Sequence, residues 1–121
     1  MIGFPRRVRV FVHRSPVDMR KAYDSLGVIV TTAFRRDLLE GDVFVFVGKD
    51  RRRAKALYWD GTGMCLLAKR LSKGRFVAPW EKPGAGPLML TLSELALLFE
   101  GSEHVGRLSL SPTEWTRTVA S

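Results

Sequence analysis

The sequence predicts a single α+β domain, in which an antiparallel β-meander sheet of about five strands packs with two main helices. Three observations support this fold class. The chain has 121 residues, which is enough for one hydrophobic core. Over residues 42–80, short apolar runs alternate with turn residues, and two stretches with helical apolar spacing flank this region. We therefore expect one domain at residues 1–101, followed by a C-terminal tail at residues 102–121.

The N-terminal part predicts a strand followed by a long helix. Residues 8–13 predict the strand, because valines alternate there with other side chains. Residues 16–36 predict the helix, since apolar residues recur at intervals of three and four. Ser15 is its expected N-cap, and Asp18 falls near the positive end of the helix dipole. This helix is expected to pack on one face of the sheet.

Four apolar runs predict the remaining strands. They occupy residues 43–47, 54–59, 64–68 and 75–78. Turn residues separate the runs, and Asp60 opens the turn between the second and the third. Gly61 and Gly63 in that turn are the residues expected to take positive backbone angles at little cost. The pattern indicates hairpins between successive strands.

The last third of the sequence contains one well-marked helix. Residues 81–87 are rich in Pro and Gly and predict a loop. Thr91 and Glu94 form a capping-box pattern at the start of an apolar stretch, which Gly101 ends. Residues 111–114 resemble a second helix start and predict a short helix within the tail.

Positive charge is concentrated in the region of the predicted sheet. The chain has a net charge of +8; residues 1–82 carry 18 Lys and Arg against 8 Asp and Glu, a net of +10, whereas residues 83–121 carry 2 against 4, a net of −2. Such a regional excess favours a nucleic acid partner over a merely solvated surface. The residues predicted to contact DNA are Arg20, Lys21, Lys49, Arg51, Arg52, Arg53, Lys55, Lys69, Arg70, Lys73 and Arg75.

No arrangement of residues indicates catalysis, a metal or a cofactor. His13 lies in a strand pattern and His104 in a predicted loop, and no Ser or Cys is placed to form a nucleophile and base pair with either. Cys65 is the single cysteine, so the chain builds no internal disulfide or cysteine metal site. No run approaches the ~18 apolar residues of a membrane span, and no signal peptide is evident. We therefore expect a cytoplasmic, nucleoid-associated protein.

Several motifs together resemble a known family. They are DMRK at residues 18–21, FVF at 44–46, KALYWDGTGMCL at 55–66, KRLSKGRF at 69–76, LT at 90–91 and LLFEG at 97–101. In this order they are similar to the insertion-sequence-66 accessory proteins called TnpB, which are unrelated to the RNA-guided nucleases of that name. The resemblance implies a bacterial transposable element with a separate DDE-type transposase. It implies no role for five of its motif residues, Asp18, Trp59, Asp60, Gly61 and Gly63.

The sequence thus predicts a non-enzymatic accessory protein that assists transposition by binding the DNA backbone. Its expected partners are DNA, at the transposon ends or the target, and the transposase of the element; a homo-oligomer is compatible with this role. The alternative is a protein-interaction subunit that holds the transposase without binding DNA itself. A metal-dependent nuclease using the aspartates of the basic region is the third interpretation.

Overall fold

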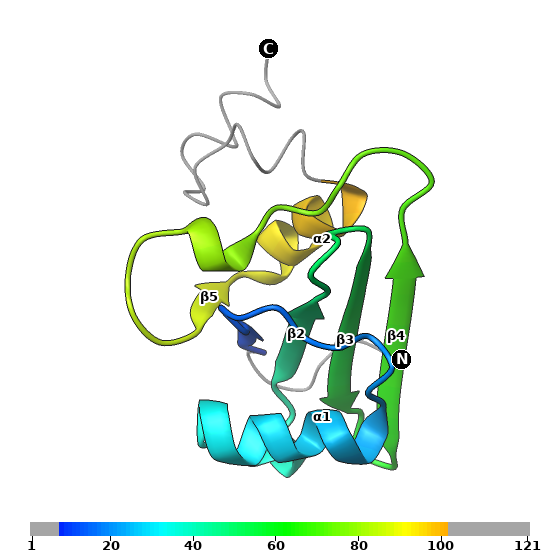
Figure 1. Ribbon diagram of the computed structural model, residues 1–121. Coiled ribbons are helices and arrows are strands. Elements are labelled where there is room, and N and C mark those ends of the chain that lie inside the picture. The colour runs from blue at the N-terminus through cyan, green and yellow to red at the C-terminus, as the bar shows by residue number, and fades with distance from the viewer. Residues whose placement is uncertain (1–7, 102–121) are drawn as a thin grey trace.

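The computed structural model of the protein describes residues 8–101 and places five strands in one sheet, in the order β4-β3-β2-β1-β5 (Figure 1). The strands are β1 (Val10–Val12), β2 (Val43–Val47), β3 (Arg53–Trp59), β4 (Met64–Arg70) and β5 (Leu88–Leu90). The helices are α1 (Tyr23–Ile29), its π-helical continuation η1 (Val30–Phe34), the 3-10 turns η2 (Leu38–Glu40) and η3 (Pro79–Glu81), and α2 (Leu92–Glu100). The predicted α+β class is confirmed.

The sheet is antiparallel except for one pair. β1 runs parallel to β2, with Val10 beside Val43, because the chain between them crosses over through α1 and η1. β2, β3 and β4 form the predicted meander of antiparallel hairpins. The expectation of a wholly antiparallel sheet is therefore wrong at β1, where a helical crossover replaces a hairpin.

The long N-terminal helix begins later than predicted. Residues 16–36 were expected to be helical from the cap at Ser15, but α1 starts at Tyr23 and η1 ends at Phe34. Val17 instead extends the sheet: it forms a parallel bridge with Gly48, and its backbone N–H donates to the carbonyl of Val47 at 3.0 Å. Pairing with the sheet therefore overrides the local helix-start signal.

The fifth strand also differs from the prediction. Residues 75–78 were expected to be a strand, but this segment is irregular, although Phe76, Val77 and Ala78 are buried. The fifth strand is instead β5, which pairs antiparallel with β1 at the edge of the sheet opposite β4. Three residues are too few to show a strand period in the sequence.

Helix α2 matches its prediction at both ends. The Thr91 Oγ1 accepts from the backbone N–H of Glu94 at 3.1 Å, and Glu94 Oε1 accepts from the backbone N–H of Thr91 at 2.9 Å. These two bonds are the capping box expected from the sequence, and Gly101 follows the last helical residue. The short helix predicted at residues 111–114, and the tail that would contain it, lie outside the described residues.

Both faces of the sheet are covered by hydrophobic side chains. On one face the valines of β1 and β2 pack with Leu98 of α2 and with Phe76, which follows β4. On the other, Phe11, Phe44 and Phe46 pack with residues of α1 and η1 such as Leu26. Alternation along the strands separates the two sets. The two helices therefore lie on opposite faces of the sheet (Figure 1).

Candidate nucleic-acid interface

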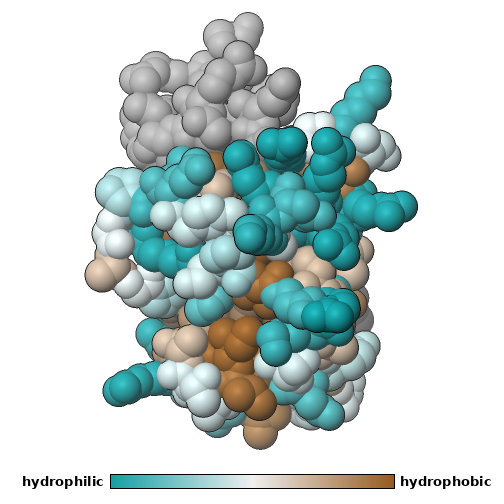
Figure 2. Space-filling view, in the orientation of Figure 1, coloured by the Kyte–Doolittle hydropathy of each residue, from teal (hydrophilic) through white to brown (hydrophobic). Residues whose placement is uncertain are grey.

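Most of the predicted DNA-contacting residues meet at one end of the sheet. β2 ends, β3 begins and β4 ends at the same rim, because the three strands form consecutive antiparallel hairpins. We call the basic residues at this rim the cationic end; they are Lys49, Arg51, Arg52, Arg53, Lys55, Lys69, Arg70, Lys73 and Arg75. Figure 2 shows hydrophilic side chains gathered over the upper part of the molecule, where β4 ends in Figure 1. The topology thus joins two basic segments that are separate in the sequence.

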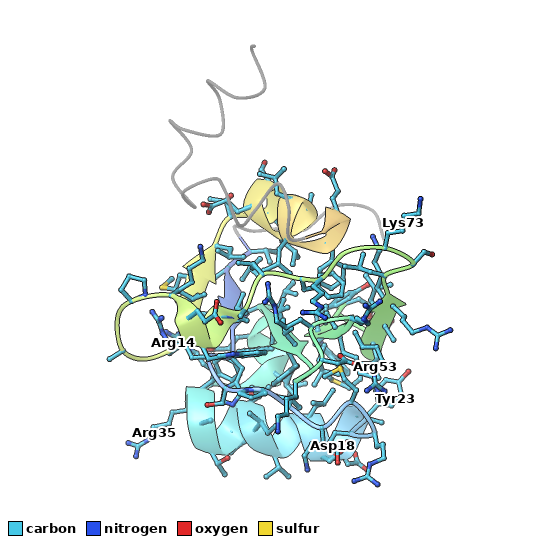
Figure 3. All side chains as sticks on the ribbon, turned by 45° about the horizontal axis from the view of Figure 1, so that its top comes forward. Arg14, Asp18, Tyr23, Arg35, Arg53 and Lys73 are labelled. Carbon is cyan, nitrogen blue, oxygen red and sulfur yellow. The ribbon has the colours of Figure 1, made fainter. Side chains whose placement is uncertain are left out.

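The DMRK segment, residues 18–21, lies beside the cationic end. The bridge between Val17 and Gly48 brings the chain to the β2–β3 turn. The ammonium of Lys55 donates to the backbone carbonyl of Lys21 at 2.7 Å, which ties the segment to β3. Figure 3 shows Asp18, Tyr23, Arg53 and Lys73 on one side of the view, with Arg14 and Arg35 on the other.

Arg53 and Arg70 form a like-charged pair across two strands. They are direct partners in the register of β3 and β4, so their side chains project from the same face of the sheet. Arg53 also bonds the carboxylate of Asp50 at 3.2 Å, whereas Arg70 has no ion pair among the described residues. A cavity of about 200 Å³ lies here, lined by Met19, Arg53, Ala54, Lys55, Ala68, Lys69 and Arg70. Two arginine side chains on the same face of the sheet, only one of them paired with a carboxylate, favour the binding of an anion beside them.

Arg51 has a structural role that the sequence did not reveal. Its backbone adopts the left-handed conformation, with φ of 61°. Its Nε donates to the carbonyl of Phe76 at 2.8 Å, and its own carbonyl accepts from the Phe76 backbone N–H at 2.6 Å. Arg51 therefore fastens the buried segment that follows β4 to the β2–β3 turn. Arg52, by contrast, is exposed and only its backbone takes part in the turn.

The remaining basic residues differ in exposure and in whether their charged groups already have a partner within the protein. Lys49, Lys73 and Arg75 lie exposed on the turns. Lys69 donates to the backbone carbonyl of Phe99 at the end of α2. Arg20 is tied to Asp18, with Nη2 and Oδ2 2.7 Å apart. The exposed turn residues and Arg70 are therefore the cations best placed to meet a ligand.

Asp18 organises a turn rather than a helix N-terminus. Its carboxylate accepts from the backbone N–H and the guanidinium of Arg20. These hydrogen bonds from Arg20 hold the pKa of Asp18 well below its usual range. The expectation that Asp18 lies near the positive end of the helix dipole is wrong, because that helix starts five residues later at Tyr23.

Asp60 holds the turn between β3 and β4. Its Oδ1 accepts from the backbone N–H groups of Thr62 at 2.8 Å and Gly63 at 3.0 Å, and these bonds lower its pKa to about 2. Gly61 has φ of 105°, which confirms its predicted role, but Gly63 does not have a positive φ. Trp59 ends β3 opposite Met64 and is half-buried. These motif residues form a hairpin turn.

Replacing Asp60 tests whether the motif is only a turn. Asp60→Asn keeps the Oδ1 acceptor, so we expect the fold and the DNA affinity to stay close to wild type at pH 7. The folded-state pKa of about 2 lies below the ordinary 3.8, so the carboxylate stabilises the fold above about pH 4 and this contribution is lost as the pH falls toward 2. Urea unfolding at pH 7 and pH 3 should show a smaller acid loss for Asp60→Asn than for wild type. Loss of transposition by the folded variant would reveal a further role.

Two other arginines have structural contacts that the sequence analysis missed. Arg9 pairs with the fully buried carboxylate of Asp42, with Nη2 and Oδ2 3.0 Å apart. Arg14 donates to the carbonyls of Gly86 and Lys82 and so holds the loop before β5. No local sequence pattern predicts these contacts, because the partners are 33 to 72 residues apart in the chain.

Within residues 8–101 the one histidine, His13, packs against aromatic side chains. His13 lies against Phe34 and Phe46, with ring centroids 5.4 and 6.1 Å away. Burial lowers its pKa, so it is neutral at physiological pH. Among residues 8–101, no group of three or more His, Cys, Asp or Glu gathers where a metal ion could be held. The same residues contain no helix long and apolar enough to cross a membrane.

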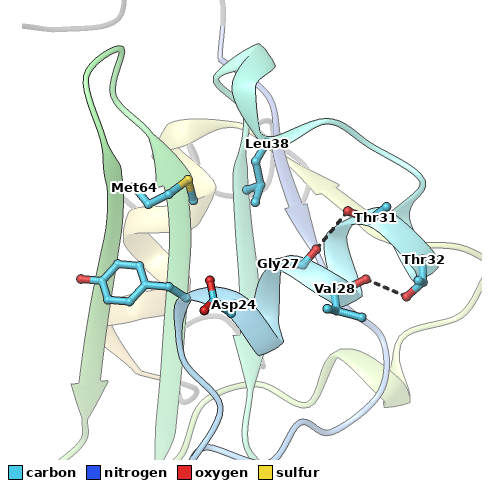
Figure 4. Close-up of a pocket in the computed structure, with 8 residues that line it drawn as sticks. Asp24, Gly27, Val28, Thr31, Thr32, Leu38 and Met64 are labelled. Atoms are coloured by element: carbon cyan, nitrogen blue, oxygen red, sulfur yellow. Dashed lines mark hydrogen bonds between the residues drawn. The ribbon is translucent and has the colours of Figure 1, made fainter.

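A second hollow lies away from the cationic end. It has a volume of about 500 Å³ and is bounded by one side of α1 and η1, Leu38 of η2 and Met64 of β4 (Figure 4). Its rim is largely apolar, and Thr31 and Thr32 direct their hydroxyls back to helix carbonyls. The other polar side chains in the lining are those of Tyr23 and Asp24.

Comparison with known proteins places the whole described domain within one set of relatives. Residues 8–107 match the family described as IS66 Orf2 like protein. The uncharacterized protein y4jC of Sinorhizobium fredii (strain NBRC 101917 / NGR234) is 41% identical over 120 residues, covering 99% of this chain and 100% of that protein. The uncharacterized protein y4hO of the same strain is 34% identical over 101 residues, covering 84% of this chain and 86% of that protein. No solved structure matches the chain.

Proposed function

The chain belongs to the IS66 Orf2-like family, the accessory proteins of insertion-sequence-66 elements, and from this premise we propose that it assists transposition by binding the DNA backbone at its cationic end. The family resemblance inferred from the sequence motifs is confirmed. The membership gives the general role in the insertion sequence. Backbone binding is the additional step, and the arrangement of charges supports it.

The observation that carries the proposal is the register that sets Arg53 directly opposite Arg70. Like charges opposite each other on two strands are unfavourable in an isolated sheet. A phosphate between them removes this repulsion and gains charge-assisted hydrogen bonds from two guanidinium groups. Exposed Lys49, Arg52 and Lys73 on the adjoining turns extend the positive surface beyond one phosphate. The arrangement thus fits a backbone that passes across the end of the sheet.

Contacts of this kind position a protein on DNA without reading its sequence. In our proposal, the transposase supplies recognition of the element's ends, and this chain supplies affinity and holds the DNA during the reaction. The proposed partners are therefore duplex DNA and the element's transposase. Proteins whose charges act only on the backbone bind different sequences with similar affinity.

A pair of matched arginine variants tests the proposal. Arg70→Ala removes a cation from the proposed site, and we expect duplex affinity to fall roughly 5-fold for a transposon end and a scrambled sequence alike, as for a contact of about 1 kcal/mol. The control is Arg35→Ala, which removes the same charge from an exposed position on the other side of the view in Figure 3. Fluorescence anisotropy with the purified full chain measures both.

Two results would contradict the proposal. Equal losses from Arg70→Ala and Arg35→Ala would mean that only net charge matters. No DNA binding by wild-type protein, together with co-purification of the transposase, would favour the alternative of a protein-interaction subunit.

A further inference from the structure

The outer edge of β4 is open within the described part of the chain. β4 has seven residues and lies at one end of the strand order, and no strand of residues 8–101 pairs with its outer side (Figure 1). Leu67, in the middle of β4, is 52% exposed. An edge strand with unpaired backbone groups is a template for another strand. The strand at the opposite edge, β5, has only three residues and so has fewer backbone groups with which another strand could pair.

We propose that the β4 strands of two copies of this chain pair antiparallel, about a two-fold axis at Leu67, to form one continuous ten-stranded sheet. This inference goes beyond the proposed function and does not depend on DNA binding. Its occupant is a second copy, because the strand is complementary to itself in register, in hydrophobic contact and in charge.

The register follows from symmetry. A two-fold axis perpendicular to the sheet keeps each face continuous, so residues that lie opposite each other must point to the same face. The axis therefore passes midway between one residue and its own copy in the partner strand. All seven residues of Met64–Arg70 find a partner only when that residue is Leu67, the midpoint of the strand.

Hydrophobic contact favours this pairing. Leu67 would lie opposite the partner's Leu67, so two half-exposed leucines would cover each other. Beside Leu67, a hollow of about 300 Å³ separates the sheet from α2 and is lined by Leu92, Leu95 and Phe99 among others. The paired leucines would therefore adjoin an apolar surface that already exists on each copy.

Charge favours the antiparallel direction. Lys69 and Arg70 occupy one end of β4, and the Asp60 turn adjoins the other. Antiparallel pairing sets Cys65 opposite the partner's Lys69, and the Cys65 Sγ lies 3.5 Å from Asp60 Oδ2, so the strand position opposite each Lys69 lies near a carboxylate rather than near a second cation. A parallel pair would instead place Lys69 and Arg70 beside their own copies, where like charges repel.

The pairing has a consequence for the cationic ends. Each copy carries its cationic end where β4 finishes, and antiparallel strands finish at opposite sides of the shared sheet. Six residue steps separate the first and last residues of β4, which places the two ends roughly 20 Å apart along the strand direction. A dimer therefore presents two separate basic surfaces rather than one.

Analytical ultracentrifugation of the full chain tests the dimer. We expect wild-type protein to sediment as a concentration-dependent dimer in the micromolar range. Leu67→Lys places two like charges at the axis and should weaken dimerisation at least 10-fold. The control Leu39→Lys changes a leucine that is 62% exposed on η2, outside the strands of the sheet, and should leave the dimer unchanged. Monomeric wild-type protein at all concentrations, or a dimer insensitive to Leu67→Lys, would overturn the proposal.

A cysteine cross-link tests the register independently of any loss of folding. In a Cys65→Ser background, Leu67→Cys should form an intermolecular disulfide under mild oxidation, because opposed residues in antiparallel strands have Cα atoms about 4.5–5.5 Å apart. Leu39→Cys in the same background should not. Equal cross-linking of both would refute the register. If Leu67→Lys is monomeric and still binds DNA, the proposed DNA binding does not depend on the dimer. If wild-type protein dimerises through β4 but binds no DNA, the dimer is supported and the proposed function is wrong.

Discussion

Combined replacement of Arg52, Arg53 and Arg70 with Ala should lower duplex affinity on the order of 100-fold and reduce transposition strongly in cells. Arg52 is exposed, and Arg53 and Arg70 face each other across β3 and β4. Each charge-assisted contact with a phosphate contributes about 1 kcal/mol, and three such losses add to a large effect. Because these contacts carry no sequence information, affinity should fall equally for all duplexes. Anisotropy and a transposition assay measure the two effects.

The triple variant should remain folded. None of the three side chains is buried, and the one ion pair that is lost, between the exposed side chains of Arg53 and Asp50, contributes little to stability. Circular dichroism and the urea midpoint should therefore stay near wild type. If the triple variant binds DNA as tightly as wild-type protein while its fold is intact, the cationic end is not the DNA-binding surface.

Arg51→Ala should destabilise the fold by roughly 1.5–3 kcal/mol, although the residue lies within the same run of three arginines. The variant loses the bond from Nε to the Phe76 carbonyl and leaves that acceptor without its partner beside a buried phenylalanine. The segment that follows β4 packs under α2, so loosening it exposes part of the core. The free energy of unfolding in urea gives the size of the effect.

Arg52→Ala is the matched control for this prediction. It removes the same side chain from the next position, where only the backbone N–H is bonded, to Asp50. We expect its unfolding free energy to stay within about 0.5 kcal/mol of wild type. Equal stability of the two variants would mean that the Arg51 contact with Phe76 contributes nothing. Comparison of the two variants thus distinguishes a structural arginine, Arg51, from one proposed to bind the ligand, Arg52.

Sequence reasoning succeeded where the signal is local. The capping box at Thr91 and Glu94 and the apolar runs of β2 and β3 were predictable, because both depend on residues within one element. The start of α1 was not, because Val17 pairs with Gly48, 31 residues later in the chain. β5 was missed for the same reason: its order comes from pairing with β1 rather than from its three residues.

The candidate site was predictable in composition but not in arrangement. The excess of Lys and Arg before residue 83 identified the region. The register that opposes Arg53 and Arg70, and the contact that turns Arg51 into a structural residue, arise from pairings between distant segments. A run of three arginines therefore looks uniform in the sequence while its members perform different tasks in the fold.

The salt dependence of duplex binding by wild-type protein tests whether the cationic end binds the DNA backbone. Binding through phosphates releases counterions, so the logarithm of the association constant should fall linearly with the logarithm of salt concentration, with a slope of about −0.9 for each phosphate neutralised. We predict a slope steeper than about −3 for wild-type protein, and a slope shallower by up to about 2.7 for the triple variant. A flat slope for wild-type protein, or identical slopes for the two proteins, would contradict backbone binding at the cationic end.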